Sequence, residues 1–289
     1  MSSLPSQYRR TRVRIAALAA GAAVLLAGCS QSAQRGFLPG VPKGETPVTN
    51  QTERITNLWT GSWIAALAVG VITWGLILWC VAVYRKRKED STLPVQLRYH
   101  VPLEVMYVIL PLIMVGVLYF YTNRDTMAIQ DTSAKPDLTV QVVAKRWSWD
   151  FNYLDQNVYD TGQQAQRISA TGVLADQVTL YLPVGQRVEF HLNSRDVIHS
   201  FWVPAFLYKM DVVPGRTNVF QIVPEREGTY VGKCAELCGE GHSDMLFNVK
   251  VVSQQDFDAH VADLKAHGQT GALGLEYDPL QHVATQGQS

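Results

Sequence analysis

Two long apolar stretches constrain the fold of this chain more than any other feature of its sequence. Residues 60–84 contain no charged side chain and would form a helix about 37 Å long, enough to cross a hydrocarbon core of roughly 30 Å. Residues 101–121 form a second such stretch, which closes with aromatic residues typical of a membrane interface. The charged fraction of 17% is below the roughly 25% of an average soluble domain. The sequence therefore predicts a hairpin of two transmembrane helices over residues 59–123.

A basic cluster sets the orientation of this hairpin. Residues 85–88 read Arg-Lys-Arg-Lys, and such clusters stay on the cytoplasmic side of a membrane. Both outer ends of the hairpin, and the chain after residue 123, are then extracytoplasmic. Glu104 is an ionisable group in the second helix, and such groups at membrane depth indicate function. A place at headgroup level near the helix start, where a carboxylate favours the helix dipole, also explains it.

The N-terminus is typical of an export signal. Four arginines in the first 14 residues precede an apolar run of about 12 residues, too short to span a bilayer. Residues 26–29 read Leu-Ala-Gly-Cys and resemble a bacterial lipobox, which predicts a signal peptide over residues 1–28 and a lipid on Cys29. An ordinary signal or a retained anchor, with Cys29 incidental, is the alternative. Residues 29–58 are expected to form an exposed extracytoplasmic linker.

Short β-type runs broken by turn residues follow the hairpin and predict an exported domain over residues 136–253. The clearest runs are 138–145, 178–182, 187–192, 218–223, 229–233 and 246–252. Their spacing favours a β-sandwich or barrel. Residues 254–289 are expected to form a helix with Phe257, Val261 and Leu264 on one side, followed by a mobile tail from Gly268.

Composition excludes several other classes of protein. A net charge of zero leaves no basic surface for nucleic acid. The hydrophobic fraction of 47% is too high for a disordered chain. Four cysteines are too few for a disulfide-dense small domain.

Metal-binding side chains concentrate in one short segment. Cys234, Cys238, His242 and Met245 fall within twelve residues, and His199 lies upstream. Thiolate, thioether and imidazole together favour copper among first-row metals. Ligands on one loop plus a histidine from an earlier strand are typical of blue-copper sandwiches, and a second cysteine allows two thiolates to bridge two copper ions. A Cys234–Cys238 disulfide, a structural zinc site, and core packing of Met245 and His199 remain alternatives.

Three features together resemble subunit II of haem–copper cytochrome c oxidases: the pattern Cys-x-Glu-x-Cys-x3-His-x2-Met at 234–245, the segment His-Ser-Phe-Trp-Val-Pro at 199–204, and the preceding hairpin. The resemblance runs from about residue 59 to residue 252. It implies an anchoring hairpin followed by a cupredoxin-like Greek-key β-sandwich with a binuclear CuA centre. The family pattern assigns both bridging positions to the cysteines. It gives one copper to His199 and Met245, and the other to His242 and the backbone carbonyl of Glu236.

The resemblance implies roles for three further side chains. Glu236 would also bind a magnesium ion shared with subunit I, a hard cation that suits a carboxylate; an exposed loop acid is the alternative. Trp147 would be the point where electrons from cytochrome c enter. It begins a run of aromatics at every second position of 147–153, which would share one face of a strand. Glu104, by its spacing to Leu110-Pro111, would lie at the mouth of a proton channel into subunit I.

The resemblance implies subunit II of a proton-pumping aa3-type cytochrome c oxidase, lipid-anchored in a bacterial cell membrane. Subunits I and III are the expected partners, with the oxygen chemistry in subunit I, and cytochrome c is the expected electron donor. Family members often carry an acid where Asn152 stands, which weakens the acidic docking patch for a soluble cytochrome c. Asp150 and Asp196 remain candidates for that patch. A donor tethered within a larger assembly depends less on charge steering.

Other functions fit the residues less well. A copper-free quinol-oxidase subunit II has the same architecture but lacks these ligands. A non-enzymatic lipoprotein with a structural zinc or disulfide leaves Met245 and Glu104 without a role. A soluble CuA enzyme such as nitrous-oxide reductase is disfavoured by the two apolar stretches.

Overall fold

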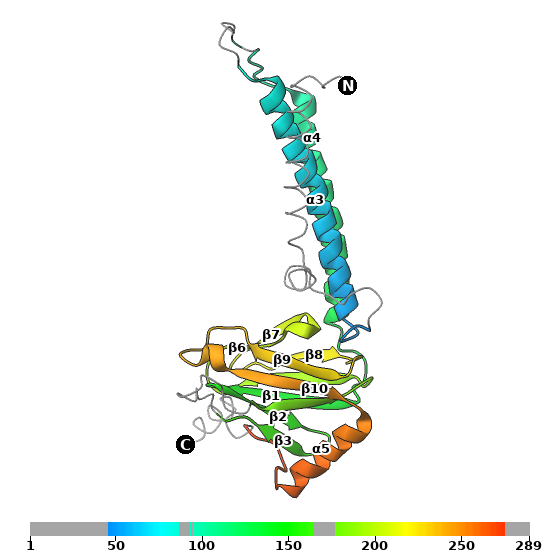
Figure 1. The fold of residues 1–289 in the computed structure, drawn as a ribbon, viewed down its shortest axis with the longest axis vertical. Coiled ribbons are helices and arrows are strands. Elements are labelled where there is room, and N and C mark those ends of the chain that lie inside the picture. The colour runs from blue at the N-terminus through cyan, green and yellow to red at the C-terminus, as the bar shows by residue number, and fades with distance from the viewer. Residues whose placement is uncertain (1–45, 87–92, 94, 164–176, 275–289) are drawn as a thin grey trace, which may run out of the picture. The chain divides into compact units, whose positions relative to one another are not determined.

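The structure, a computed structural model, describes residues 46–86, 93, 95–163 and 177–274 (Figure 1). The predicted signal peptide over residues 1–28 and the lipid on Cys29 lie outside the described residues. Within them, two long helices precede a β-domain that carries one further helix.

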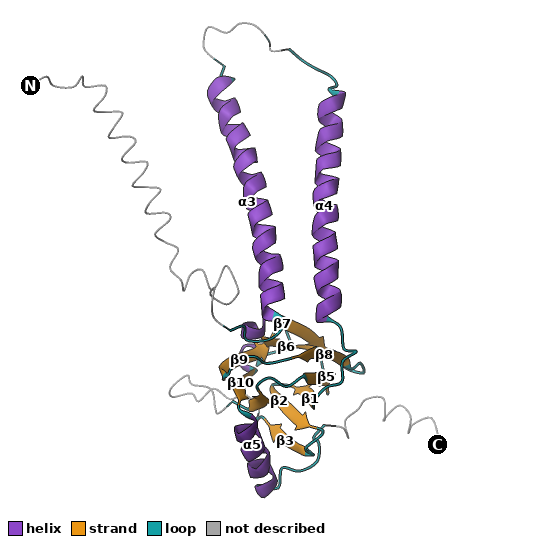
Figure 2. Cartoon of the chain, turned by 90° about the vertical axis from the view of Figure 1, so that its right-hand side faces the viewer, coloured by secondary structure: helices purple, strands orange, loops and turns teal. Residues whose placement is uncertain are grey.

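The two apolar stretches form the helices α3, Thr52–Val83, and α4, Val101–Ile129. Both are long and apolar enough to cross a membrane, and most of their apolar side chains are exposed in the isolated chain. Figure 2 shows the helices alongside each other. The start of α3 meets the end of α4, where Arg54 Nη1 lies 3.2 Å from Asp125 Oδ1. The helices therefore form an antiparallel hairpin.

The first helix begins earlier than the sequence predicts. α3 starts inside the segment 29–58 that is expected to be an exposed linker, and Thr49 just before it is fully buried. The N–H of Thr49 donates to Oγ1 of Thr52 at 3.1 Å, and the N–H of Asn50 donates to the carbonyl of Val223 at 3.0 Å. The second bond joins positions far apart in sequence, so local composition does not reveal it. It fixes the chain to the β-domain before the helix begins.

The described part of the β-domain contains ten strands in two five-stranded sheets. The strands are β1 (Leu138–Lys145), β2 (Ser148–Tyr153), β3 (Val158–Thr161), β4 (Thr179–Pro183), β5 (Val188–Ser194), β6 (His199–Val203), β7 (Tyr208–Val212), β8 (Asn218–Ile222), β9 (Gly228–Cys234) and β10 (Leu246–Val252). One sheet has the order β3-β2-β1-β5-β8 and the other β4-β10-β9-β6-β7. Each sheet contains one parallel pair, β1 with β5 and β4 with β10. The domain is a β-sandwich of mixed sheets.

Aromatic side chains from both sheets fill the core. Alternation along β5 buries Phe190, while the residues on either side of it are only partly buried. The ring of Phe201 on β6 lies 5.9 Å from that of Trp149 on β2 and 5.0 Å from that of Phe247 on β10. Such contacts between rings add to the free energy gained by burying their surface. They hold the two sheets together beside the first residues of β6.

Three strands, β3, β6 and β7, are not among the runs singled out in the sequence. Four of the five residues of β6 are buried. The strand therefore lacks the alternation of buried and exposed residues that a strand with one solvent-exposed face shows. β3 is only four residues long. Short strands and strands buried on both faces leave little periodicity to detect.

The C-terminal helix α5 spans Gln254–Ala266. Its N-terminus is capped by Ser253, whose Oγ accepts the N–H of Asp256 at 3.1 Å. Phe257, Val261 and Leu264 are buried, which is the face expected from their spacing. Figure 1 shows α5 beside β3, against which it packs.

Residues 268–274, which we call the C-terminal strap, correct the prediction of a tail that is mobile from Gly268. The N–H of Gly271 donates to the carbonyl of Asn157 at 2.9 Å. The side chain of Asn152 holds Leu273 twice: Oδ1 accepts its N–H at 2.9 Å and Nδ2 donates to its carbonyl at 2.8 Å. These bonds use backbone groups and a strand 121 residues away. A local Gly- and Gln-rich composition cannot reveal them.

Candidate metal centre

The strands of one sheet deliver the predicted ligands to a single place. His199 is the first residue of β6 and Cys234 the last of β9. The loop between β9 and β10 carries Cys238 and His242 and ends at Met245. Antiparallel pairing of β9 with β10 brings the two ends of this loop together, and the N–H of Cys234 donates to the carbonyl of Met245 at 3.1 Å. The sheet register thus closes the loop that carries the ligands.

The donor atoms of these residues converge. The two cysteine sulfurs are 3.9 Å apart. Cys234 Sγ lies 3.8 Å from His199 Nδ1, and Cys238 Sγ lies 3.6 Å from His242 Nδ1. Met245 Sδ lies 3.8 Å from Cys238 Sγ. His199, Cys234 and Cys238 by themselves form a buried group that could hold a metal ion.

A backbone oxygen completes the set. The carbonyl of Glu236 lies 3.2 Å from Cys234 Sγ, whereas the Glu236 side chain is exposed. The same residue therefore presents its carbonyl to the cluster and its carboxylate to the surface.

The position of the His199 ring is fixed by Asp196, which the sequence suggested only as a docking acid. His199 Nε2 lies 2.8 Å from Asp196 Oδ1, so Nδ1 is left to face Cys234. Burial raises the pKa of Asp196, but the bonds from His199, Arg146 and Val197 outweigh it and lower the pKa overall. A carboxylate behind a histidine ligand is common in metal sites, because it fixes the tautomer and the ring orientation. The spacing Asp-x-x-His at 196–199 is the sequence feature from which this role of Asp196 could have been predicted.

The two thiols differ in acidity. Burial raises the pKa of Cys234, but hydrogen bonds from His199 and from backbone groups lower it to about 6. Burial and the charge of Cys234 raise the pKa of Cys238 to about 12. Two adjacent thiolates therefore repel each other strongly without a cation between them. This arrangement favours binding of a positively charged metal.

The geometry separates the interpretations that the sequence left open. The sulfur separation of 3.9 Å far exceeds a disulfide bond of about 2.05 Å, and both cysteines are free. Zinc prefers four ligands and has no need for a thioether, yet Met245 is fully buried with its sulfur in the cluster. Thiolate, imidazole and thioether donors together are consistent with copper.

Trp147 lies in the turn between β1 and β2, not in a strand. It therefore does not continue the alternation of Trp149, Phe151 and Tyr153, which are all fully buried. Its partly buried indole Nε1–H donates to the carbonyl of Cys238 at 3.2 Å. The structure thus joins Trp147 directly to the loop that carries the ligands.

Asp150, a candidate for the docking patch, is buried, and so is Asn152, where family members often carry an acid. Asp150 is fully buried, 2.6 Å from Lys145 Nζ and 3.6 Å from Arg195 Nη1. Asn152 is fully buried beneath the C-terminal strap. The expectation that Asp150 contributes to a docking patch is therefore wrong, because its buried carboxylate forms ion pairs within the domain.

Glu104 is not part of this cluster. It lies in the first turn of α4, where its Oε1 accepts the N–H of His100 at 2.9 Å. In return His100 Nδ1 accepts the N–H of Leu103 at 3.3 Å. This reciprocal arrangement caps the helix.

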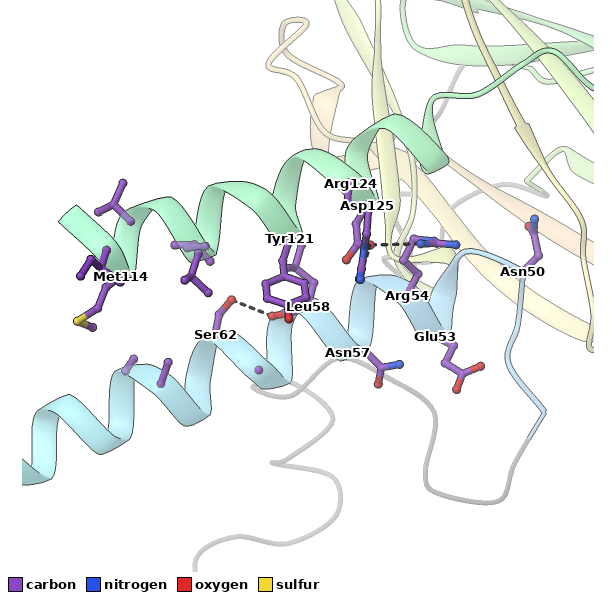
Figure 3. A pocket seen from close by; sticks show the side chains of 17 residues that line it. Asn50, Glu53, Arg54, Asn57, Leu58, Ser62, Met114, Tyr121, Arg124 and Asp125 are labelled. Carbon is purple, nitrogen blue, oxygen red and sulfur yellow. Dashed lines mark hydrogen bonds and ion pairs between the residues drawn. The ribbon is translucent and has the colours of Figure 1, made fainter. Parts of the chain in front are cut away.

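A cavity of about 1010 Å³ lies between α3 and α4 (Figure 3). Its wall is mostly apolar, and at one end Asp125 lies between Arg54 and Arg124. It is lined by no cysteine or histidine, so it is separate from the candidate metal centre.

Comparison with known proteins identifies the family. Residues 138–252 match the family described as cytochrome c oxidase subunit II, periplasmic domain. A probable cytochrome c oxidase subunit 2 of Streptomyces avermitilis is 48% identical over 78% of this chain and 80% of its own length. The cytochrome c oxidase subunit 2 of Mycobacterium tuberculosis is 33% identical over 91% of this chain and 84% of its own.

Among solved structures, the periplasmic domain of subunit II of the cytochrome oxidase of Bradyrhizobium japonicum is 30% identical. It aligns with a TM-score of 0.42 over 46% of this chain and 97% of that one. The similarity to the Streptomyces relative extends over most of both sequences. This chain therefore belongs to the cytochrome c oxidase subunit 2 family.

Proposed function

We propose that this chain is the electron-accepting subunit of a proton-pumping, aa3-type cytochrome c oxidase. It receives electrons one at a time from cytochrome c at a binuclear CuA centre and delivers them to subunit I, where oxygen is reduced to water. The observation that carries this proposal is the convergence of two thiols, two imidazoles, a thioether and a carbonyl at one end of a sheet. Family membership supports the oxidase as the assembly in which the chain works.

The ligand assignment is the one that the family pattern implies. Cys234 and Cys238 would each contact both copper ions. His199 with Met245 would complete one copper, and His242 with the carbonyl of Glu236 the other. When bound, the two copper ions would supply a one-electron redox couple. The chain contributes a buried pocket that is held closed by β9 and β10, so little rearrangement of ligands accompanies a change of charge.

Trp147 is the proposed point of electron uptake. Its indole is partly exposed and donates to the carbonyl of Cys238, a ligand residue. This gives a short route from the surface to the centre. Beside it, the acid Asp150 is neutralised internally by Lys145 and Arg195. Positions 150 and 152 thus add no exposed acid to a docking surface, which leaves Glu240 of the ligand loop as an exposed acid near Trp147 and supports a donor that relies less on charge, such as a tethered cytochrome c. Electron uptake should then vary weakly with ionic strength.

Subunits I and III are the proposed partners in the membrane. Two exposed apolar side chains flank the ligands: Leu237 is 78% exposed and Ile198 is 47% exposed. Apolar surface beside a buried functional site is suited to a protein interface. The exposed carboxylate of Glu236 would there share a magnesium ion with subunit I, since Mg²⁺ prefers carboxylate oxygen.

Glu104 is proposed to admit protons to a channel in subunit I in addition to capping α4. Its contact with His100 keeps the carboxylate in the first turn of the helix. Basic residues follow α3 directly, which supports a cytoplasmic location for this end of the hairpin.

The remaining parts of the proposal concern the membrane anchor. The chain would be a bacterial membrane lipoprotein with both termini and the β-domain outside the cytoplasm, attached through Cys29. Mass spectrometry of the mature N-terminus tests this: a lipid-modified Cys29 is the expected result, and an intact Met1 or an unmodified Cys29 would contradict it.

The metal centre is tested on the full chain, purified in detergent and loaded with copper. We expect two copper ions per chain and a mixed-valence EPR spectrum, because the thiolates bridge both sites. Cys238→Ser should abolish that spectrum. Cys80→Ser is the matched control, since Cys80 is an exposed cysteine on α3, outside the cluster. A chain that prefers zinc, or that holds its copper ions electronically separate, would overturn the proposal.

A further inference from the structure

Two glycines of the ligand loop lie against the indole of Trp147. A Cβ atom at position 241 would lie 2.7 Å from Cδ2, 2.8 Å from Cγ and 3.0 Å from Cε3 of that ring. A Cβ atom at position 239 would lie 3.1 Å from Cζ2 and 3.3 Å from Nε1. The ring therefore packs directly on the backbone of the loop at two places. An alanine at position 241 would force the ring or the loop to move.

The two glycines are required for different reasons. Gly239 has φ +123°, a conformation that residues with a side chain rarely adopt, so its backbone alone explains a glycine. Gly241 has φ −85° and ψ 14°, which any residue can adopt. Backbone freedom thus does not account for Gly241. The close contact with the Trp147 ring explains the glycine at this position instead.

Hydrogen bonds also hold the indole and the turn that carries it. Its Nε1–H donates to the carbonyl of Cys238 at 3.2 Å. The turn that carries it is held by the N–H of Arg146, which donates to Asp196 Oδ2 at 2.7 Å. Asp196 in turn contacts the ring of His199. The indole is therefore placed by one hydrogen bond, one turn and the absence of a side chain at position 241.

We propose that Gly241 is a positioning residue for electron uptake: by lacking a side chain it lets the Trp147 indole pack on the ligand loop beside Cys238. This inference rests on the proposed function of Trp147. A methyl group at position 241 lengthens the gap between ring and loop and weakens the indole hydrogen bond. The bound metal keeps its ligands, because the Gly241 side chain position faces Trp147 and not the sulfurs.

The test is Gly241→Ala in the assembled oxidase. We expect electron uptake from reduced cytochrome c to slow on the order of tenfold, because a displacement of up to about one ångström is enough to slow a reaction that depends on orientation. Copper content, the mixed-valence EPR spectrum and electron transfer from the centre to subunit I should stay as in the parent. A cryo-EM map of the variant should show the indole displaced. Ser243→Ala, an exposed change in the same loop, is the matched control and should change none of these.

A second substitution separates this inference from the proposed function. In a Trp147→Ala oxidase, adding Gly241→Ala should cause no further slowing, because the two changes act through one contact. If Trp147→Ala alone leaves electron uptake unchanged, the proposed role of Trp147 fails. If Trp147→Ala slows uptake and Gly241→Ala does not, only the inference about Gly241 is overturned.

Loss of copper in Gly241→Ala would also be informative. The clash would then have displaced the loop and not the ring. Removing the indole should relieve the clash with the added methyl group. The double variant Trp147→Ala with Gly241→Ala should therefore regain the copper content of the parent. Failure to regain copper would show that Gly241 acts through another contact and would overturn the inference.

Discussion

At the scale of single residues, the metal centre depends on side chains that are not ligands. Asp196 Oδ1 contacts His199 Nε2 at 2.8 Å and leaves Nδ1 to face Cys234. The same carboxylate accepts the N–H of Arg146 at 2.7 Å and that of Val197 at 2.7 Å. These bonds orient the imidazole before any metal binds.

Asp196→Ala is therefore expected to weaken copper binding about 10- to 100-fold, the usual effect of losing the partner of a histidine ligand. The measurement is equilibrium competition with a copper chelator on the full chain in detergent. The pKa of Asp196 is lowered in the folded chain. Its contribution is therefore complete above the ordinary value of 3.8 and is lost only as the pH falls below it. Asp196 is therefore ionised throughout the neutral range. Although burial lowers the pKa of His199, Asp196 helps to raise it overall, so protons compete with copper more in the parent at lower pH. The difference in affinity should thus be largest at the upper end of that range.

Asp211→Ala is the control for this prediction, because Asp211 is an exposed acid on β7. It should bind copper as the parent does. Equal copper affinities for Asp196→Ala and the parent would show that the strands alone orient His199.

At the scale of elements, the pairing of β9 with β10 decides where the ligands lie. Lys233 pairs with Leu246. The loop therefore begins after Cys234 and ends at Met245, which lie next to each other. Gly232 pairs with Phe247 across the two strands and packs beneath its ring, so a Cβ atom at position 232 would overlap that ring. The register of these strands thus places both ends of the ligand loop.

Gly232→Ala should consequently lower the free energy of unfolding by about 1–3 kcal/mol, the usual cost of overpacking a core. Thermal unfolding of the copper-free chain measures this directly. Phe247→Leu in the same chain should recover part of the loss, because the smaller side chain leaves room for the added methyl group. An additive loss in the double variant would argue against the contact.

The C-terminal strap is a second element with a specific attachment. Asn152→Asp keeps the acceptor for the N–H of Leu273 but removes the donor to its carbonyl and buries a charge. An unsatisfied buried group costs about 1–3 kcal/mol, so the strap should detach. Limited proteolysis with mass spectrometry should then show faster cleavage after residue 267.

Asn218→Asp makes the same chemical change at a partly buried amide on β8, which donates to the carbonyl of Asp211. This control should leave cleavage of the strap unchanged. Equal protection of the strap in Asn152→Asp would mean that backbone bonds alone hold it.

At the scale of the whole molecule, the sequence predicts what depends on local spacing and misses what depends on distant contacts. The apolar stretches and the pattern from Cys234 to Met245 are each contained in a short segment, and the structure forms helices and a cluster there. The turn position of Trp147 and the attachment of the strap to Asn152 involve partners about a hundred residues away. Periodicity carries no information about such partners.

The hairpin has a different polar group at each end. Where α3 begins and α4 ends, Asp125 is buried between Arg54 and Arg124. Where α4 begins, Glu104 caps the helix by accepting the N–H of His100. In the first cluster, the single carboxylate of Asp125 is shared by the two arginines. Glu104 accepts a backbone bond and pairs with no basic side chain among the described contacts, so its charge remains available for another role.

Glu104→Gln separates the two roles of this residue. The glutamine Oε1 can still accept the N–H of His100, so the cap and the helix should be retained, whereas the group can no longer bind and release a proton. We expect reconstituted oxidase with this change to accept electrons from cytochrome c at the parent rate but to take up protons more slowly after an oxygen pulse. Glu53→Gln, at an exposed acid in the first turn of α3, is the matched control and should behave as the parent. Proton uptake at the parent rate in Glu104→Gln would leave helix capping as the whole role of Glu104. A loss of electron uptake would instead show that the substitution disturbs assembly, and the proton role would then have to be abandoned.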